Sequence, residues 1–132
     1  MGRDSAKTDF GLLLLNWYDS NAFSYPWRLS KDPYGVWLSE IMLQQTRVIT
    51  VIPYYNDWLI DLPSVAAVAG VDMEYILKKW EGLGYYARAR NFYYACEIVI
   101  NKFGGKIPLD YSNFLSLPGV GTYISGAVLS IA

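Results

Sequence analysis

Glu40 is the residue whose type and surroundings best suit acid–base chemistry. It lies in the run from Trp37 to Thr46, WLSEIMLQQT, in the middle of a predicted helix with apolar neighbours on both sides. Partial burial raises the pKa of a carboxyl group, so Glu40 can act as a general acid near neutral pH. The alternative is a solvated glutamate on an amphipathic helix, which is the commoner case when only the neighbouring residues are considered.

A glycine-rich turn, Leu117-Pro118-Gly119-Val120-Gly121, precedes the last predicted helix. The proline fixes φ, and the two glycines permit backbone angles and close approaches that a Cβ would block. Free N–H groups and the helix dipole favour an anion at the helix start, so a turn between two short helices suits a DNA phosphate. An ordinary loop before a core helix is the alternative, because Gly-x-Gly alone is a weak signal.

Two further segments combine residue types that bind nucleic acid. Residues 44–46, QQT, lie at a predicted helix end, where they can exchange hydrogen bonds with base edges or form a solvated terminus. Residues 82–90, GLGYYARAR, join a flexible loop to aromatic side chains and spaced arginines. Such residues stack on bases and bind phosphate. The alternative for Tyr85 and Tyr86 is packing at a helix start.

The composition excludes several chemistries. The chain has 132 residues, no histidine and one cysteine, Cys96, which excludes a Ser-His-Asp triad, an internal disulfide framework and a cysteine-built metal site. It is 53% hydrophobic, enough for one domain with a core. The net charge is −1, but lysines and arginines gather in residues 78–106, next to the glycine turn. A phosphate-facing surface and a solvated helix face explain this charge equally well.

The elements that must position these residues are helices. The hydrophobic periodicity is helical along the chain and strand signals are poor, so we expect an all-α fold. Asp32, Ser64 and Asp72 are predicted N-caps, and Gly104-Gly105 ends the longest helix. The predicted helices run from about Thr8 to Asn21, Pro33 to Gln45, Arg47 to Asp61, Val65 to Val68, Met73 to Trp80, Tyr85 or Tyr86 to Phe103, Tyr111 to Leu115, and from Thr122 onward.

The two ends of the chain give different signals. Residues 1–8 lack the apolar run of a secretory signal, and no apolar stretch is long enough to span a bilayer, so we expect no membrane association. The last helix is still apolar and uncapped at Ala132. We therefore expect the chain to be a piece of a longer protein.

Taken together, these segments resemble the helix-hairpin-helix DNA glycosylase superfamily, and within it the adenine DNA glycosylases of the MutY type. The resemblance covers residues 10–132, and its most specific parts are 26–28 (PWR), 37–46, 80–90 and 117–130. Several long motifs in the family's order are a far stronger signal than one short match.

The resemblance implies base-excision repair, in which adenine mispaired with 8-oxoguanine or guanine is removed from double-stranded DNA. It implies a cytoplasmic, nucleoid-associated bacterial enzyme without an obligate protein partner. For the fold it implies a six-helix barrel over residues 22–132, with the helix-hairpin-helix at about 112–131. The preceding helix, 1–21, would belong to a later domain that holds a 4Fe-4S cluster. The cluster's cysteines would follow Ala132, so it implies no metal in this piece, apart from a monovalent cation at the hairpin.

The resemblance also assigns roles to matching positions. Glu40 matches the acid that protonates the flipped-out adenine and then handles the attacking water. Tyr123 matches a tyrosine that supports the catalytic centre. The remaining matches are Trp27, Arg28 and Leu43 around the adenine pocket, Gln45 and Tyr85 as wedges in the duplex, Thr46 and Leu83 near the opposing base, and Gly119, Val120 and Gly121 at a DNA phosphate. From their residue type and spacing, Arg88 and Arg90 are predicted to contact DNA phosphates as well.

Two features distinguish the chain from endonuclease III, a relative that removes oxidised pyrimidines. That enzyme has a catalytic lysine where Tyr123 stands and lacks an acid matching Glu40. Without the lysine amine, a Schiff base cannot form and the lyase step cannot occur, so we expect a monofunctional glycosylase. The family's catalytic aspartate would follow Ala132, so this piece alone should be inactive. The alternatives are a related glycosylase for another mispaired base, such as thymine in G·T pairs, a non-catalytic DNA-binding module, and a purely structural helical protein.

Overall fold

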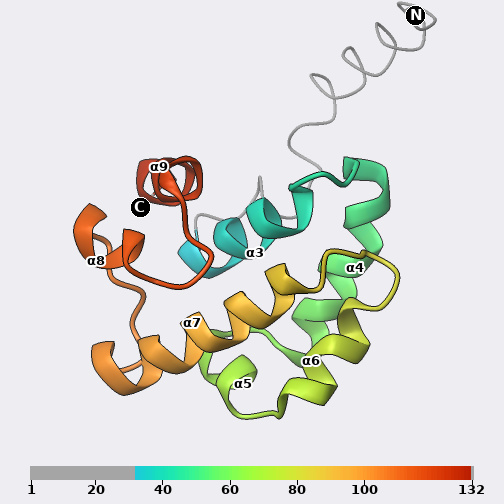
Figure 1. Cartoon of the computed structure of the whole chain (residues 1–132), viewed down its shortest axis with the longest axis horizontal. Coiled ribbons are helices and arrows are strands. Elements are labelled where there is room, and N and C mark those ends of the chain that lie inside the picture. The colour runs from blue at the N-terminus through green and yellow to red at the C-terminus, as the bar shows by residue number, and fades with distance from the viewer. Residues whose placement is uncertain (1–31, 132) are drawn as a thin grey trace, which may run out of the picture. The chain divides into compact units, whose positions relative to one another are not determined.

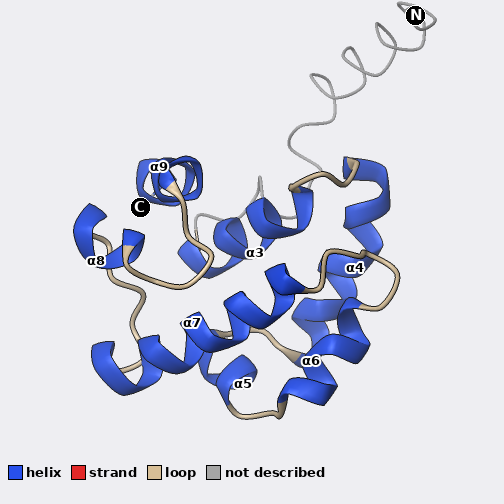
Figure 2. Ribbon diagram, in the orientation of Figure 1, coloured by secondary structure: helices blue, strands red, loops and turns tan. Residues whose placement is uncertain are grey.

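The computed structural model describes residues 32–131 and contains helices but no strand within that range (Figure 2). The all-α prediction is confirmed for these residues, whereas the helix predicted at 8–21 lies outside them. The helices are α3 (Pro33–Leu43), α4 (Val48–Asp61), α5 (Val65–Ala69), α6 (Met73–Trp80), α7 (Ala87–Phe103), α8 (Tyr111–Leu115) and α9 (Thr122–Ile131).

Short polar side chains start four of these helices by accepting a hydrogen bond from a backbone amide in the first turn. The pairs are Asp32 with Tyr34, Ser64 with Ala67, Asp72 with Tyr75, and Asp110 with Asn113. The first three caps were predicted, and the cap at Asp110 was not. At the other end of α7, Gly104 has φ 64°, the left-handed conformation predicted for a glycine that ends a helix.

Aromatic side chains from separate helices form the core. Trp37 of α3 makes edge contacts with Phe92 of α7 and Phe114 of α8, with ring centroids 4.8 and 5.2 Å apart. Trp58 of α4 packs edge-on against Trp80 of α6 at 5.8 Å. All five side chains are fully buried. Edge-to-face contacts are favoured by the ring quadrupoles, so they fix the angles between helices as well as burying apolar surface.

The helix that carries Glu40 packs alongside the helix that carries Tyr123. In Figure 1, α7 runs through the described domain with α5 and α6 along it, and α9 lies beside α3. Ser39 on α3 and Ser125 on α9 are both fully buried, and their small side chains suit a close approach of two helices. The packing therefore brings the two helices with candidate catalytic residues together.

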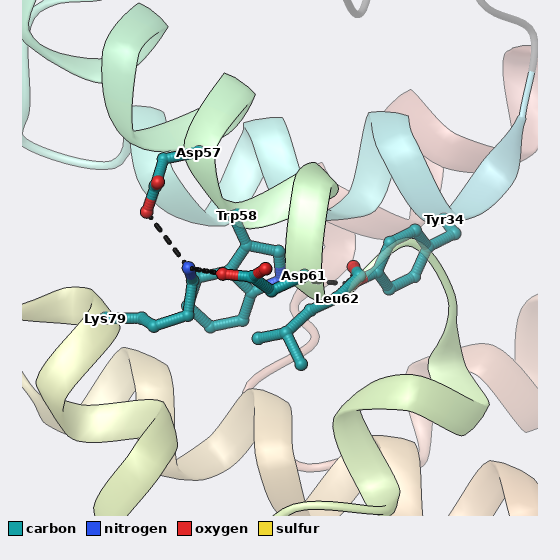
Figure 3. Close-up of polar contacts among 6 residues, drawn as sticks. All are labelled: Tyr34, Asp57, Trp58, Asp61, Leu62 and Lys79. Carbon is teal, nitrogen blue, oxygen red and sulfur yellow. Dashed lines mark hydrogen bonds and ion pairs between the residues drawn. The ribbon is translucent and has the colours of Figure 1, made fainter.

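Polar contacts tie α4 to its neighbours (Figure 3). The Tyr34 hydroxyl donates to the carbonyl of Leu62 at 2.6 Å and accepts from the Trp58 indole at 3.0 Å. Burial raises the pKa of Tyr34 far above its ordinary value, so the phenol stays neutral. On the exposed side, the Lys79 ammonium lies 3.0 Å from Asp57 and 2.7 Å from Asp61, which joins α6 to α4.

Candidate nucleic-acid interface

The turn after α3 holds its second residue in an unusual backbone conformation. α3 ends at Leu43, and Gln45 has φ 59° with an exposed side chain. A residue with a Cβ adopts this left-handed region uncommonly, since the side chain crowds the backbone there. Thr46 closes the turn: its amide donates to the carbonyl of Leu43 at 3.3 Å. The fold therefore presents Gln45 outward at a small cost in strain.

Two hydrogen bonds, from Tyr54 and Trp80, hold the loop between α6 and α7 in place. The Tyr54 hydroxyl of α4 donates to the carbonyl of Glu81 at 2.8 Å, and the Trp80 indole donates to the carbonyl of Gly84 at 2.9 Å. Gly82 has φ 101°, and a Cβ there would lie 2.0 Å from the Tyr54 hydroxyl. Only glycine fits this position without displacing Tyr54.

Tyr85 is the exposed tip of that loop. Its side chain is 62% exposed, and its φ of 49° is the second positive φ among the non-glycine residues that the structure describes, after that of Gln45. One pocket of about 560 Å³ is lined by Gln44, Gln45, Tyr85, Ala87 and Arg88. The structure thus brings together the two residues that the sequence analysis assigned to wedging, although they come from different loops.

Leu83 and Arg88, two predicted DNA contacts in the same region, are not fully exposed to solvent. Leu83 is only 6% exposed and lies under the loop. Arg88 is half-buried, and its guanidinium donates to the carbonyl of Ile41 near the end of α3 at 2.9 Å and to that of Gly84 in the second loop at 3.3 Å. The expectation that Arg88 contacts a DNA phosphate is therefore revised, because its terminal N–H groups already have acceptors inside the protein. Arg90 on α7 is exposed.

The candidate catalytic residues differ in exposure. Glu40 lies near the C-terminal end of α3 and is half-buried, and Leu43 one turn later is also half-buried. Tyr123, in the first turn of α9, is 71% exposed. Trp27 and Arg28, expected at the adenine pocket, lie outside the described residues.

The glycine turn joins α8 to α9, as the predicted hairpin requires. Gly119 has φ 77°, and a Cβ there would lie 2.8 Å from the Asn91 side chain of α7, so this glycine is needed by the fold itself. At Gly121 a Cβ would meet nothing within 4 Å in the described part of the chain. The amide of Val120 donates to the carbonyl of Leu117 at 3.1 Å, so it is not free for a phosphate as expected.

Asn91 and Tyr54 were missed by the sequence analysis. A small pocket of about 120 Å³ reaches from the end of α3 to the hairpin, with Asn91 and Gly119 among its lining residues. Asn91 therefore packs against Gly119 of the hairpin, and Tyr54 hydrogen-bonds the start of the loop after α6. Neither role has a local sequence signal, because each depends on a partner far along the chain.

These features converge with a family match. Residues 38–128 match the HhH-GPD superfamily of base excision DNA repair proteins, a span that includes Glu40, both loops and the hairpin. The chain belongs to this superfamily.

Within the superfamily, the chain is similar in sequence to proteins named adenine DNA glycosylases. It is 41% identical over 127 residues to the adenine DNA glycosylase of Buchnera aphidicola subsp. Acyrthosiphon pisum, covering 96% of this chain and 36% of the relative. It is 41% identical over 140 residues to the adenine DNA glycosylase of Homo sapiens, covering 98% of this chain and 26% of that protein. The chain thus spans about a third or less of the length of these relatives.

Solved structures agree on the fold of the superfamily. A thermostable thymine-DNA glycosylase superposes with a TM-score of 0.78 at 28% identity, covering 90% of this chain and 55% of that one. A trapped endonuclease III–DNA covalent intermediate gives a TM-score of 0.73 at 21% identity, which supports the fold alone, covering 90% of this chain and 56% of that one. Among the residues that the structure describes, no helix is long and apolar enough to cross a membrane.

Proposed function

We propose that the whole protein to which this chain belongs is a monofunctional adenine DNA glycosylase acting on adenine paired with 8-oxoguanine or guanine. The observation that carries the proposal is that Gln45 and Tyr85 line the same pocket, since both were assigned to the duplex from sequence alone. The superfamily match and the adenine DNA glycosylases at 41% identity support it. The proposed location of the enzyme is the bacterial cytoplasm, in association with the nucleoid.

Glu40 is the proposed acid. Its carboxyl group gives a proton to the ring of an adenine that has left the base stack, and the electron pair of the breaking glycosidic bond goes to the base. The sugar then develops positive charge, and a water oxygen bonds to its anomeric carbon while the carboxylate accepts a proton from that water. The products are free adenine and an abasic site. Tyr123 stands where endonuclease III has its catalytic lysine, so it supports the catalytic centre without forming a Schiff base.

The hairpin is the proposed phosphate site. The amides of Gly119 and Gly121 donate to no other described residue, and they precede the positive end of the α9 dipole. The open space at Gly121 suits a DNA backbone that approaches closely. Arg90, exposed on the neighbouring α7, adds a second phosphate contact.

The cofactors of the proposal do not enter these steps. A 4Fe-4S cluster needs four cysteine ligands, and this chain has one cysteine, Cys96, which is buried in the core. The residues of this chain therefore cannot supply the ligands of a cluster, which would come from the rest of the protein. A monovalent cation at the hairpin stays a prediction.

A glycosylase for thymine in G·T pairs is the second candidate, favoured by the 28% identity to a thymine-DNA glycosylase. Base release separates the two candidates. The whole protein is incubated with duplexes that contain A opposite 8-oxoguanine, A opposite G, T opposite G, and A opposite T. The proposal expects adenine from the first two duplexes only. Thymine release would support the second candidate, and no release from any duplex would reduce the function to DNA binding.

A further inference from the structure

The Arg88 side chain reaches from the first turn of α7 to the C-terminal end of α3. Its Nη1 atom lies 2.9 Å from the carbonyl oxygen of Ile41 and 3.3 Å from that of Met42, and it also donates to the carbonyl of Gln44. The last carbonyls of a helix have no partner inside the helix, and the helix dipole favours a cation there. Arg88 therefore caps α3 from a distant element and fixes the start of the turn that carries Gln45.

The other terminal nitrogen of Arg88 bonds the second loop. Nη2 lies 3.4 Å from the carbonyl oxygen of Leu83 and 3.3 Å from that of Gly84. It also lies 3.4 Å from the Thr46 hydroxyl, which belongs to the first loop. The guanidinium carbon is 5.5 Å from the centre of the Tyr85 ring, within the range of a cation–π contact. One planar group thus contacts both loops at once.

The two loops need such a support. Each contains one residue with a Cβ in the left-handed conformation, Gln45 at φ 59° and Tyr85 at φ 49°. Residues with a Cβ adopt this conformation uncommonly, and it persists only where surrounding contacts determine it. Hydrogen bonds to the carbonyls that precede Gln45 and Tyr85 supply such contacts.

We infer that Arg88 is a positioning residue that sets the distance between the two loops, so that Gln45 and Tyr85 meet the duplex as one unit. The inference rests on the proposed function for the role of these two side chains. Lysine cannot replace Arg88, because one ammonium group cannot direct donors to acceptors on two sides as a planar guanidinium does.

Hydrogen exchange tests the structural half of the inference in the whole protein. Arg88→Ala and Arg88→Lys should speed amide exchange in both 43–47 and 82–86, while the core of α7 stays protected. Lys79→Ala is the control: it removes a cation that also joins two elements, but the hydrogen bonds of Lys79 go to Asp57 and Asp61 of α4 and not to either loop. Exchange that rises in neither loop, or in only one, would overturn the coupling. The lysine variant keeps the test decisive if the alanine variant fails to fold.

DNA binding tests the functional half. We expect Arg88→Lys to lower the ratio of affinity for an A:8-oxoguanine duplex over an undamaged duplex by on the order of tenfold or more, as for a misplaced contact. The salt dependence of non-specific binding should not change even in Arg88→Ala, which removes the charge, because no phosphate contact is lost. Equal weakening of Arg88→Ala on both duplexes, with a salt slope smaller by about one, would make Arg88 a phosphate contact instead. If the unaltered protein shows no preference for the mispair, the proposed function fails, while hydrogen exchange still decides whether Arg88 couples the loops.

Discussion

Gln45 and Tyr85 face the same pocket from different loops, and both have a left-handed backbone, with φ of 59° and 49°. Glycine would adopt these angles without strain, yet a large polar side chain and an aromatic side chain stand there. Such strain is found where a protein needs a particular side chain at a particular place. The pair therefore marks the surface at which we expect the duplex to be read.

Replacing Gln45 by glycine should separate stability from function. Gly relieves a left-handed strain of about 1–2 kcal/mol but adds backbone entropy to the unfolded chain, so unfolding free energy should change by about zero to +1 kcal/mol. The preference for a mispaired duplex should fall, since the wedging side chain is gone. Denaturant unfolding and competition binding measure the two effects. Gln44→Gly is the control for the stability measurement: its φ of −64° is unstrained, so that variant should lose stability and not gain it. A large loss of stability in Gln45→Gly would contradict the strain.

The two glycines of the hairpin should behave differently when each is changed to alanine. Gly119→Ala combines a left-handed φ of 77° with a 2.8 Å contact to Asn91, so it should cost about 1–3 kcal/mol of stability. Gly121→Ala meets nothing within 4 Å, so it should cost less than about 0.5 kcal/mol. DNA affinity should nevertheless fall on the order of tenfold in Gly121→Ala, because its Cβ would face the approaching phosphate. Unchanged affinity in this variant would move the phosphate site away from the hairpin.

The ion pairs of Lys79 predict a pH dependence of stability. The hydrogen bond from Lys79 lowers the pKa of Asp61 below its ordinary 3.8, so this contribution is present above pH 3.8 and is lost as pH falls through the lowered value. For Lys79, burial lowers the pKa, but the bonds to Asp61 and Asp57 outweigh it and raise the pKa above 10.5. That contribution is present below pH 10.5 and is lost as pH rises through the raised value.

Lys79→Met should therefore flatten the pH profile at both ends. Denaturant unfolding followed by tryptophan fluorescence gives the stability at each pH. The neighbouring Lys78→Met is the control, since Lys78 is exposed and forms no salt bridge within the described residues. Some acid sensitivity should remain in both variants, because the cap at Asp110 also has a lowered pKa, caused by its hydrogen bonds with Asn113. Identical profiles in the two variants would show that the Lys79 pairs contribute nothing measurable.

Local rules predicted the helices well, and long-range contacts explain what they missed. The caps at Asp32, Ser64 and Asp72 and the glycine end of α7 depend on a few adjacent residues, so the sequence is enough to find them. The positive φ of Gln45 has no local signal, since glycine is the residue that the rules expect there. It depends on contacts with residues far along the chain, above all Arg88.

Arg88 is the clearest case of a residue misread from sequence. An arginine beside aromatic residues and glycines is typical of a phosphate contact, and Arg90 two positions later has the same neighbourhood. The fold turns Arg88 inward to the carbonyls of α3 and leaves Arg90 exposed. Burial lowers the pKa of Arg88, and nearby Tyr85 opposes that change, which agrees with a guanidinium held inside the protein.

The measurement that tests the central claim most directly is adenine release by the whole protein and its Glu40→Gln variant, from a duplex with A opposite 8-oxoguanine. Glutamine keeps the size of the half-buried side chain but cannot give a proton, so we expect release to fall by about 10²-fold or more while DNA binding is retained. Release that survives in the variant would contradict the role of Glu40. No release by the unaltered protein would contradict the function itself.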